Sequence, residues 1–309
     1  MELPDERWHP SLRSIVDAML AVWPEHAAFL GRSLPAGDAD ALAHAERVAA
    51  TLDRLIGDRR AEVCGDYRWT CERLLEEELH FRRHGAYRLS RFADAEREVY
   101  ANPAFMARYV NGLLLSHLFW ANHRGVLRSF ETSFLPRCPE AFRYLEIGPG
   151  HGLYLALAAG RPGCREAVGW DVSETSAEQT RLSLARLGAG GRARIERADI
   201  LYPPGEAGGF DAVVVSEVLE HLEDPDAVLA SLRALAAPDG LLFVNMPVNS
   251  PAPDHIYLLR EPDEVRQLVE RNGFALVETA NFPATGYSEE RARKHGATIS
   301  CVVIATPAS

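Results

Sequence analysis

The chain has 309 residues, of which 47% are hydrophobic and 25% are charged, and its formal net charge is −11. This composition is ordinary for a globular protein of about two domains, which excludes a disordered chain and a disulfide-dependent mini-protein. The acidic balance disfavours a general nucleic-acid binder, because such proteins need a basic surface to neutralise phosphates.

The cysteines and the N-terminus predict a cytoplasmic protein. The chain has 5 Cys, an odd number without metal-ligand spacing, which indicates isolated reduced thiols. The acidic start of the chain does not resemble a signal peptide, and we find no apolar run of about 18 residues that could span a membrane. Lys294 is the single lysine beside many arginines and alanines, which is typical of a high-GC bacterial genome.

The first part of the chain, residues 1–138, is predicted to be all-helical. Apolar residues recur at intervals of three and four in two early segments, and a third, rich in Glu and Arg, follows. The strongest segment begins at Asn102-Pro103, a good helix start, and is almost continuously apolar. These segments cover 12–20, 42–56, 66–84 and 104–123. A stretch at 135–139 with two prolines is a predicted linker, so we place the domain boundary between residues 138 and 139.

The second part, residues 139–309, alternates short apolar runs with helical segments. Such alternation predicts an α/β fold in which helices cover both faces of a mostly parallel sheet. The predicted strands are 142–147, 166–171, 193–197, 210–215, 240–245, 274–279 and 298–306. The predicted helices lie near 152–160, 173–188, 224–236 and 261–272.

A glycine-rich turn follows the first predicted strand. It reads Glu146-Ile-Gly148-Pro-Gly150-His-Gly152, and a helix is expected directly after it. Glycines without Cβ atoms let the backbone approach a ligand closely at the start of a helix. Leu153 stands where a dinucleotide-binding motif requires its third glycine, so this turn belongs to another class.

Acidic residues follow the next strands at informative positions. Asp171 closes the second strand, 23 residues after Gly148, where a carboxylate can accept both ribose hydroxyls of a nucleoside. Asp171 could instead cap the next helix, but Ser173 is the better cap. Asp199-Ile200 follows the third strand, and the fourth ends in Ser216-Glu-Val-Leu-Glu-His-Leu-Glu-Asp-Pro225.

Together these motifs resemble those of class I S-adenosylmethionine-dependent methyltransferases, over residues 142 to about 306. The resemblance implies a Rossmann-like seven-stranded sheet whose last strand is antiparallel, with the N-terminal helices as a cap. It also implies that S-adenosylmethionine is the cofactor. The residues that it assigns to cofactor binding are Glu146, Gly148, Gly150, Gly152, Asp171, Val172, Asp199, Ile200, Ser216 and Glu217.

Methyl transfer from a sulfonium mainly requires that the acceptor atom be held close to the methyl carbon and in line with it. A base is needed only when an oxygen or nitrogen acceptor arrives protonated. Ligands of α/β sheets bind at the carboxyl ends of strands, so we take His221, Asp254 and His255 as candidate catalytic residues. His255 lies in a loop stiffened by three prolines, and an imidazole near its ordinary pKa could take a proton there. An exposed loop histidine is the alternative reading.

Candidate substrate-binding residues come from the cap helix at 104–123 and from the loop after the fifth strand. They are Tyr109, Trp120, Asn122, Asn249 and Tyr257. The Arg-rich run at 82–91 could attract an anionic acceptor, although a solvated face explains it more simply. His221, His255 and His295 have no recognisable ligand spacing, so the sequence predicts no metal site.

We therefore expect methyl transfer to an oxygen or nitrogen of a small molecule in bacterial specialised metabolism. Alternatives are a protein or tRNA methyltransferase, a non-catalytic cofactor-binding subunit, or an enzyme that uses the cofactor for other chemistry. We expect a small-molecule substrate and neither nucleic acid nor membrane as a partner. A homodimer stays open.

Overall fold

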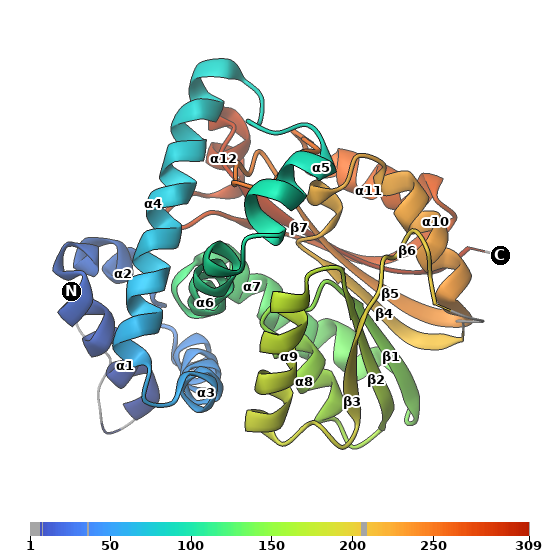
Figure 1. Ribbon diagram of the computed structural model, residues 1–309, viewed down its shortest axis with the longest axis horizontal. Helices are drawn as coiled ribbons and strands as arrows, with labels where there is room; N and C mark the ends of the chain where they lie inside the picture. The colour runs from blue at the N-terminus through green and yellow to red at the C-terminus, as the bar shows by residue number, and fades with distance from the viewer. Residues whose placement is uncertain (1–6, 8, 36, 205–208, 309) are drawn as a thin grey trace.

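The computed structural model describes residues 7, 9–35, 37–204 and 209–308. Most of the acidic N-terminal start, residues 1–6 and 8, lies outside this description, as do residues 36, 205–208 and 309. Helices come first, and strands and helices then alternate, as the sequence predicts (Figure 1). In the part of the chain that the structure describes, no helix is both long and apolar enough to cross a membrane.

The N-terminal part is helical, and polar side chains cap the start of α3 and α6. The Asp38 side chain accepts a hydrogen bond from the Ala41 N–H at 3.0 Å, and Asn102 accepts one from Phe105 at 3.1 Å. The main helices are α1 (Pro10–Val22), α2 (Ala27–Ser33), α3 (Ala39–Ile56), α4 (Arg60–His84), α5 (Phe92–Ala95), α6 (Pro103–Phe119) and α7 (Ala121–Ser129). Short helical turns cover η1 (Pro24–His26), η2 (Glu96–Tyr100), η3 (Phe130–Phe134) and η4 (Leu135–Arg137).

The apolar segment predicted as one helix over 104–123 is two helices. Trp120 adopts an extended conformation, with φ −101° and ψ 130°, and separates α6 from α7. No proline or glycine marks this break in the sequence. Contacts from distant segments accompany it: the Trp120 indole N–H donates to the Tyr67 hydroxyl at 2.8 Å, and the Ala121 N–H donates to Thr285 Oγ1 at 3.0 Å.

The second part contains the predicted seven-stranded sheet, in the order β3-β2-β1-β4-β5-β7-β6. The five strands β1 to β5 pair in parallel, and β7 is antiparallel to both of its neighbours, which confirms the expected topology. The strands are β1 (Phe142–Ile147), β2 (Cys164–Asp171), β3 (Ala193–Arg197), β4 (Phe210–Ser216), β5 (Ala236–Val248), β6 (Phe274–Pro283) and β7 (Ile299–Pro307).

Helices cover both faces of the sheet, because strand residues are apolar on both sides. The helices are α8 (Leu153–Ala159), α9 (Glu174–Leu187), η5 (Leu219–His221), α10 (Pro225–Leu235), α11 (Pro262–Arg271) and α12 (Glu289–His295). On one face, Tyr144 and Phe243 pack with α8 and the N-terminal helices. On the other, Leu145 and Val244 pack with α10 and α11.

The N-terminal helices share a hydrophobic core with the sheet. Phe119, Phe130 and Phe134 are fully buried in the same cluster as Tyr144 and Phe243. Figure 1 shows α6 and α7 between the outer helices and the sheet. The division into a cap of residues 1–138 and a cofactor domain of 139–309 stays a prediction, since this cluster spans the proposed boundary.

Candidate active site

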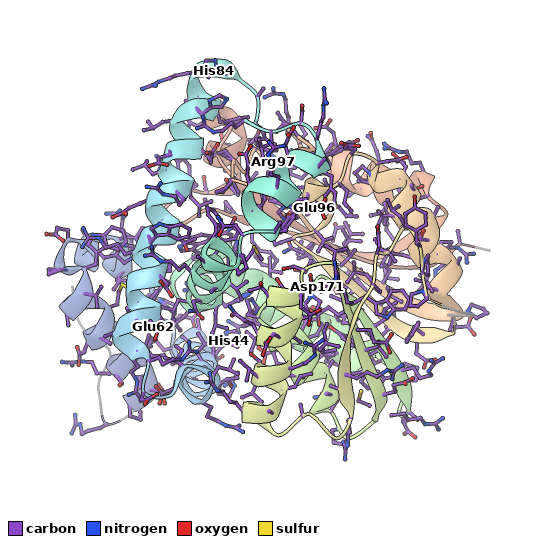
Figure 2. All side chains as sticks on the ribbon, viewed as in Figure 1. His44, Glu62, His84, Glu96, Arg97 and Asp171 are labelled. Carbon is purple, nitrogen blue, oxygen red and sulfur yellow. The ribbon has the colours of Figure 1, made fainter. Side chains whose placement is uncertain are left out.

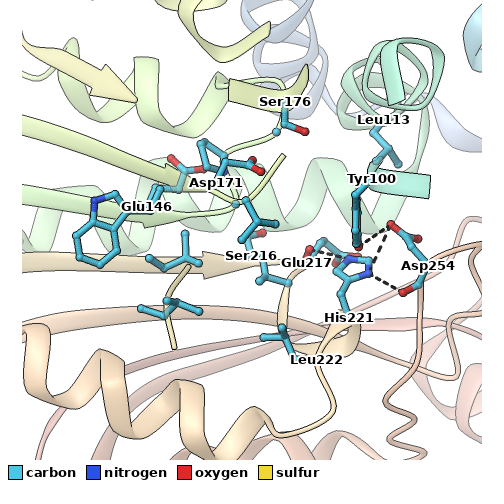
Figure 3. A pocket seen from close by; sticks show the side chains of 18 of the residues that line it. Tyr100, Leu113, Glu146, Asp171, Ser176, Ser216, Glu217, His221, Leu222 and Asp254 are labelled. Atoms are coloured by element: carbon cyan, nitrogen blue, oxygen red, sulfur yellow. Dashed lines mark hydrogen bonds and ion pairs between the residues drawn. The ribbon is translucent and has the colours of Figure 1, made fainter. Parts of the chain in front are cut away.

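A cavity of about 420 Å³ lies at the carboxyl ends of β1, β2 and β4. Its wall combines loops of the sheet with side chains of η2, α6 and α7, among them Tyr100, Leu113 and Val126. Figure 3 shows Asp171 and Glu146 at one end, and His221 and Asp254 at the other. One cavity therefore connects the predicted cofactor residues with the predicted catalytic residues.

The glycine turn after β1 forms part of the wall. Gly148, Gly150 and Gly152 all have positive φ, at 64°, 55° and 75°. A Cβ atom on Gly148 would lie 2.7 Å from the Val218 side chain, which accounts for glycine at this position. Gly148 and Gly150 line the cavity, whereas Gly152 precedes α8 and packs against Thr180.

Asp171, at the end of β2, is 8% exposed and lines the cavity. Its Oδ1 accepts the Ser173 N–H at 2.8 Å, and Ser173 in turn caps α9, as the sequence suggests. Burial raises the pKa of Asp171 to about 6, although hydrogen bonds from backbone N–H groups act to lower this pKa. These hydrogen bonds hold the carboxylate in place, while burial disfavours its charged form.

Glu146 lies on the neighbouring strand and is 3% exposed. The Tyr144 hydroxyl donates to its Oε2 at 3.0 Å, yet burial raises the pKa of Glu146 to about 8. Further along the wall, Asp199 accepts the Leu201 N–H at 2.9 Å, and Ile200 is buried beside it. Val172 also lines the cavity, as expected for the cofactor set.

Glu217 has a backbone conformation that is rare for a residue with a side chain. Its φ is 54°, which carries strain that functional sites often contain. The Asn245 amide donates to Glu217 Oε1 at 2.8 Å and to Ser216 Oγ at 3.0 Å, which fixes both side chains at the end of β4. Burial raises the pKa of Glu217 to about 7.

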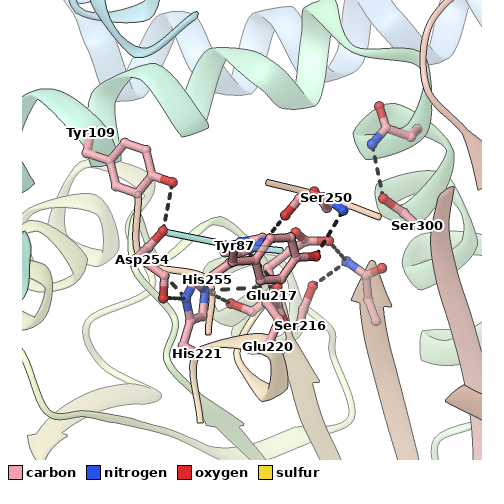
Figure 4. Close-up of polar contacts among 12 residues, drawn as sticks. Tyr87, Tyr109, Ser216, Glu217, Glu220, His221, Ser250, Asp254, His255 and Ser300 are labelled. Atoms are coloured by element: carbon pink, nitrogen blue, oxygen red, sulfur yellow. Dashed lines mark hydrogen bonds and ion pairs between the residues drawn. The ribbon is translucent and has the colours of Figure 1, made fainter. Parts of the chain in front are cut away.

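The three candidate catalytic residues lie together at the other end of the cavity (Figure 4). His221 Nδ1 is 3.1 Å from the Asp254 backbone oxygen and 3.5 Å from its carboxylate. The rings of His221 and His255 have centroids 4.8 Å apart. His221 precedes Asp254 and His255 by more than thirty positions in the sequence, and the structure brings it next to both.

His255 is not the exposed loop residue that is the alternative reading of the sequence. It is 5% exposed, and burial lowers its pKa to about 3, so the expectation of an ordinary pKa is wrong. The loop is tied to η5, because Ile256 and Tyr257 both donate their N–H to the Glu220 carbonyl at 2.9 Å. His255 is therefore a neutral, fixed imidazole.

Two tyrosines from the N-terminal helices reach the same place. Tyr109 donates its hydroxyl to Asp254 Oδ1 at 3.1 Å, and Tyr100 donates to Oδ2 at 3.2 Å. Tyr109 was expected among the substrate residues and lines the cavity. No sequence motif indicates Tyr100, or Tyr87, whose hydroxyl accepts the Ser250 N–H at 3.0 Å.

The other four expected substrate residues are not among the side chains that line this cavity. Trp120 bonds to Tyr67, and the Asn122 amide donates to Ser300 Oγ at 3.0 Å, because the break after α6 turns both away. The Asn249 amide donates to the Arg260 carbonyl, and Tyr257 packs against the core of the C-terminal part.

Three further histidines line the wall between the two ends. His117 and His151 are joined through their Nε2 atoms at 2.9 Å, and His123 Nδ1 is 2.7 Å from Ser116 Oγ. Burial lowers the pKa of His117 to about 4 and that of His123 to about 3, so both imidazoles are neutral near pH 7.

The remaining predicted charges lie elsewhere. Arg82 pairs with Glu78 within α4, and Arg88, which follows the end of this helix, pairs with Glu77, which favours the solvated-face reading of this run. His295 ends α12 beside Tyr287, with ring centroids 6.5 Å apart, and does not join the other two histidines.

Comparison with known proteins shows which family the sheet and its loops resemble. Residues 119–279, more than half of the chain, match a family described as a methyltransferase domain. A ubiquinone biosynthesis O-methyltransferase of Brucella ovis is 36% identical over 109 residues, which are 35% of this chain and 42% of that protein. The chain thus spans about two-fifths of the length of the curated relatives that it matches.

Solved structures share the fold at low sequence identity. A complex that contains the Trm112 methyltransferase activator of Haloferax volcanii matches with a TM-score of 0.50 and 16% identity, over 67% of this chain and 95% of that one. The [4+2]-cyclase SpnF matches with a TM-score of 0.49 and 17% identity, over 60% of this chain and 81% of that one.

Proposed function

Because the chain belongs to the methyltransferase domain family, we propose that it transfers the methyl group of S-adenosylmethionine to an oxygen of a small molecule. The observation that carries this proposal is the single cavity of about 420 Å³ that runs from Asp171 to Asp254. Aromatic and aliphatic side chains of the N-terminal helices form its outer wall, as in sites that take small apolar ligands with a few polar groups.

The residues at the sheet end fit the cofactor. Asp171 offers two buried carboxylate oxygens to the ribose hydroxyls, and the glycine turn leaves room for backbone approach. Asp199 and Ile200 stand where adenine is expected, and Glu217 lies toward the methionine part. When bound, S-adenosylmethionine supplies a methyl carbon on a sulfonium, an already activated leaving group.

The acceptor end is suited to a hydroxyl group on an apolar body. S-adenosylmethionine held at the sheet end would supply the methyl carbon to the acceptor oxygen, and its sulfur would keep the electron pair of the carbon–sulfur bond. The hydroxyl proton passes to the Asp254 carboxylate, which lines the cavity. Asp254 takes this role because His255 is a poor base at its lowered pKa, and both ring nitrogens of His221 face backbone carbonyl oxygens.

An oxygen acceptor on a small molecule is supported by two observations, and a role in bacterial specialised metabolism stays part of the proposal. The matched relatives are named O-methyltransferases of a small-molecule biosynthesis. No arginine or lysine is found among the described residues that line the cavity, which disfavours a phosphate-rich tRNA acceptor.

The test is release of S-adenosylhomocysteine on a panel of small hydroxyl compounds with aromatic or aliphatic bodies, beside tRNA and protein fractions. Leu113→Trp fills the cavity from α6, so it should raise the acceptor KM or abolish turnover while cofactor affinity stays within about threefold. Leu79→Trp, at a position that is 46% exposed on α4, is the matched control and should behave as the parent. Turnover on tRNA or protein, and none on the panel, would contradict the proposal.

A further inference from the structure

Glu220 is a buried carboxyl group beside other acidic groups. It lies in η5 and is 0% exposed, and no hydrogen bond of normal geometry from the described residues reaches Oε1 or Oε2, while burial and the nearby Glu217 carboxyl raise its pKa. An unpaired buried carboxylate is costly, because burial removes its hydration and nothing replaces it. The neighbouring groups therefore indicate what kind of ligand could stabilise the Glu220 carboxylate.

Two imidazoles point at this carboxyl group (Figure 4). His221 Nε2 and His255 Nε2 are each 3.9 Å from Glu220 Oε1. This is too long for a hydrogen bond, so neither histidine satisfies the carboxyl directly. The three ligand atoms lie within 4.8 Å of one another.

The other ring nitrogens fix the orientation of both imidazoles. Nδ1 of His255 faces the Ser250 carbonyl, and Nδ1 of His221 faces the Asp254 carbonyl at 3.1 Å. When each Nδ1–H donates to its carbonyl, both Nε2 atoms carry lone pairs directed toward Glu220. Metal-bound histidines are held in this way, with the second ring N–H on a carbonyl or carboxylate.

The backbone adds a further electron-rich group. The Glu217 carbonyl oxygen is 3.1 Å from His221 Nε2, so a lone pair faces a carbonyl unless a cation or proton lies between them. Glu217 and Asp254 also bring their carboxyl groups close to Glu220. Among the described residues that line the adjoining cavity, none is an arginine or lysine that could offset this negative charge.

We propose that Glu220, His221 and His255 bind a divalent first-row transition metal ion at the acceptor end of the cavity. Ligand atoms about 2.1 Å from one ion are about 3.0–3.4 Å apart, so small side-chain movements close the present separations. Two imidazole nitrogens and a carboxylate suit Mn²⁺, Fe²⁺, Co²⁺ or Zn²⁺, whereas Mg²⁺ and Ca²⁺ prefer oxygen ligands.

Three protein ligands leave coordination positions open toward the cavity, which His221 and His255 line. An acceptor hydroxyl bound there would have a lowered pKa and lose its proton to Asp254 more readily. This role rests on the proposed function, but binding of the ion to the free protein does not.

Metal binding is measured on the full chain after chelator treatment, without acceptor or cofactor. Titration with Co²⁺ should produce visible absorption bands, and Zn²⁺ or Mn²⁺ should bind in calorimetry more tightly than Mg²⁺. Glu220→Gln and His255→Gln should each weaken binding at least about tenfold.

The surface pair His80 and His84 on α4 provides the matched control. Their rings have centroids 4.4 Å apart at i and i+4, an arrangement that can bind metal adventitiously. Figure 2 shows His84 at the end of α4, far from Asp171. The double variant His80→Ala, His84→Ala should retain the binding. Binding that disappears in this double variant but persists in Glu220→Gln and His255→Gln would overturn the proposal, as would no binding by the parent protein.

Discussion

Replacement of Asp171 by Asn tests the cofactor assignment most directly. The change keeps the volume of the side chain and one carbonyl oxygen, but it removes the charge and the second acceptor. Asp171 is 8% exposed and held by the Ser173 N–H at 2.8 Å, so its position should survive the substitution. The measured effect then reports on the lost interaction with the ribose hydroxyls.

The size of the effect depends on pH. Loss of a charge-assisted, two-point hydrogen bond costs about 1.5–3 kcal/mol, which is roughly 10- to 150-fold in affinity. This difference should be complete near pH 8, where Asp171 is ionised. Because burial raises the pKa of Asp171 to about 6 in the free protein, the parent affinity should fall by about tenfold for each pH unit below that value.

The assay is calorimetry with S-adenosylhomocysteine, which is not consumed, between pH 5 and pH 8. The parent protein should show affinity that decreases below pH 6, so the difference between the two proteins should be about tenfold smaller at pH 5 than at pH 8. Asp171→Asn should show a nearly flat profile over this range. Equal affinities at pH 8, or the same pH dependence in both proteins, would refute the assignment of Asp171 to the ribose.

Three other predictions concern stability and turnover. Glu146 has a folded pKa of about 8, above its ordinary value of 4.5, so the protein should lose stability as pH rises between these values; Glu146→Gln should lose less in thermal melts. A fragment of residues 1–135 should not melt as a cooperative monomer, because Phe119, Phe130 and Phe134 lose the sheet side chains that bury them; a sharp monomeric transition would contradict this. Asp254→Asn should lower kcat about 10²- to 10⁴-fold, with cofactor affinity nearly unchanged; normal turnover would place the proton elsewhere.

The cofactor end of the cavity could be predicted because its signals are local in the sequence. Each motif combines the end of a strand, a turn and the start of a helix within a few residues. Gly148, Asp171 and Asp199 all lie in such turns and line the cavity, as expected. Alternation of strands and helices likewise predicted the sheet, since period and length are read from neighbouring residues.

The acceptor end could be predicted only in part, because its contacts join distant segments. The Tyr100 and Tyr109 hydroxyls donate hydrogen bonds to Asp254 across more than 140 positions, and no local sequence pattern predicts such a contact. The assignment of Trp120 and Asn122 assumed one continuous helix. The extended conformation at Trp120 ends α6. Helical spacing counted from α6 therefore does not predict which way the side chains after it point.

The tyrosine contacts join the N-terminal helices to the acceptor end, whereas the pair His117 and His151, at 2.9 Å, joins α6 to the glycine turn. Asp254 is held by two tyrosine hydroxyls from η2 and α6, whereas Asp171 is held by the Ser173 N–H in its own turn. A change at Tyr100 or Tyr109 therefore reaches Asp254 directly, but it reaches the proposed ribose site at Asp171 only through other residues. Tyr100→Phe and Tyr109→Phe, if they preserve folding, should alter turnover and acceptor KM while cofactor affinity stays constant, which is how one sheet can serve different acceptors through different neighbouring helices.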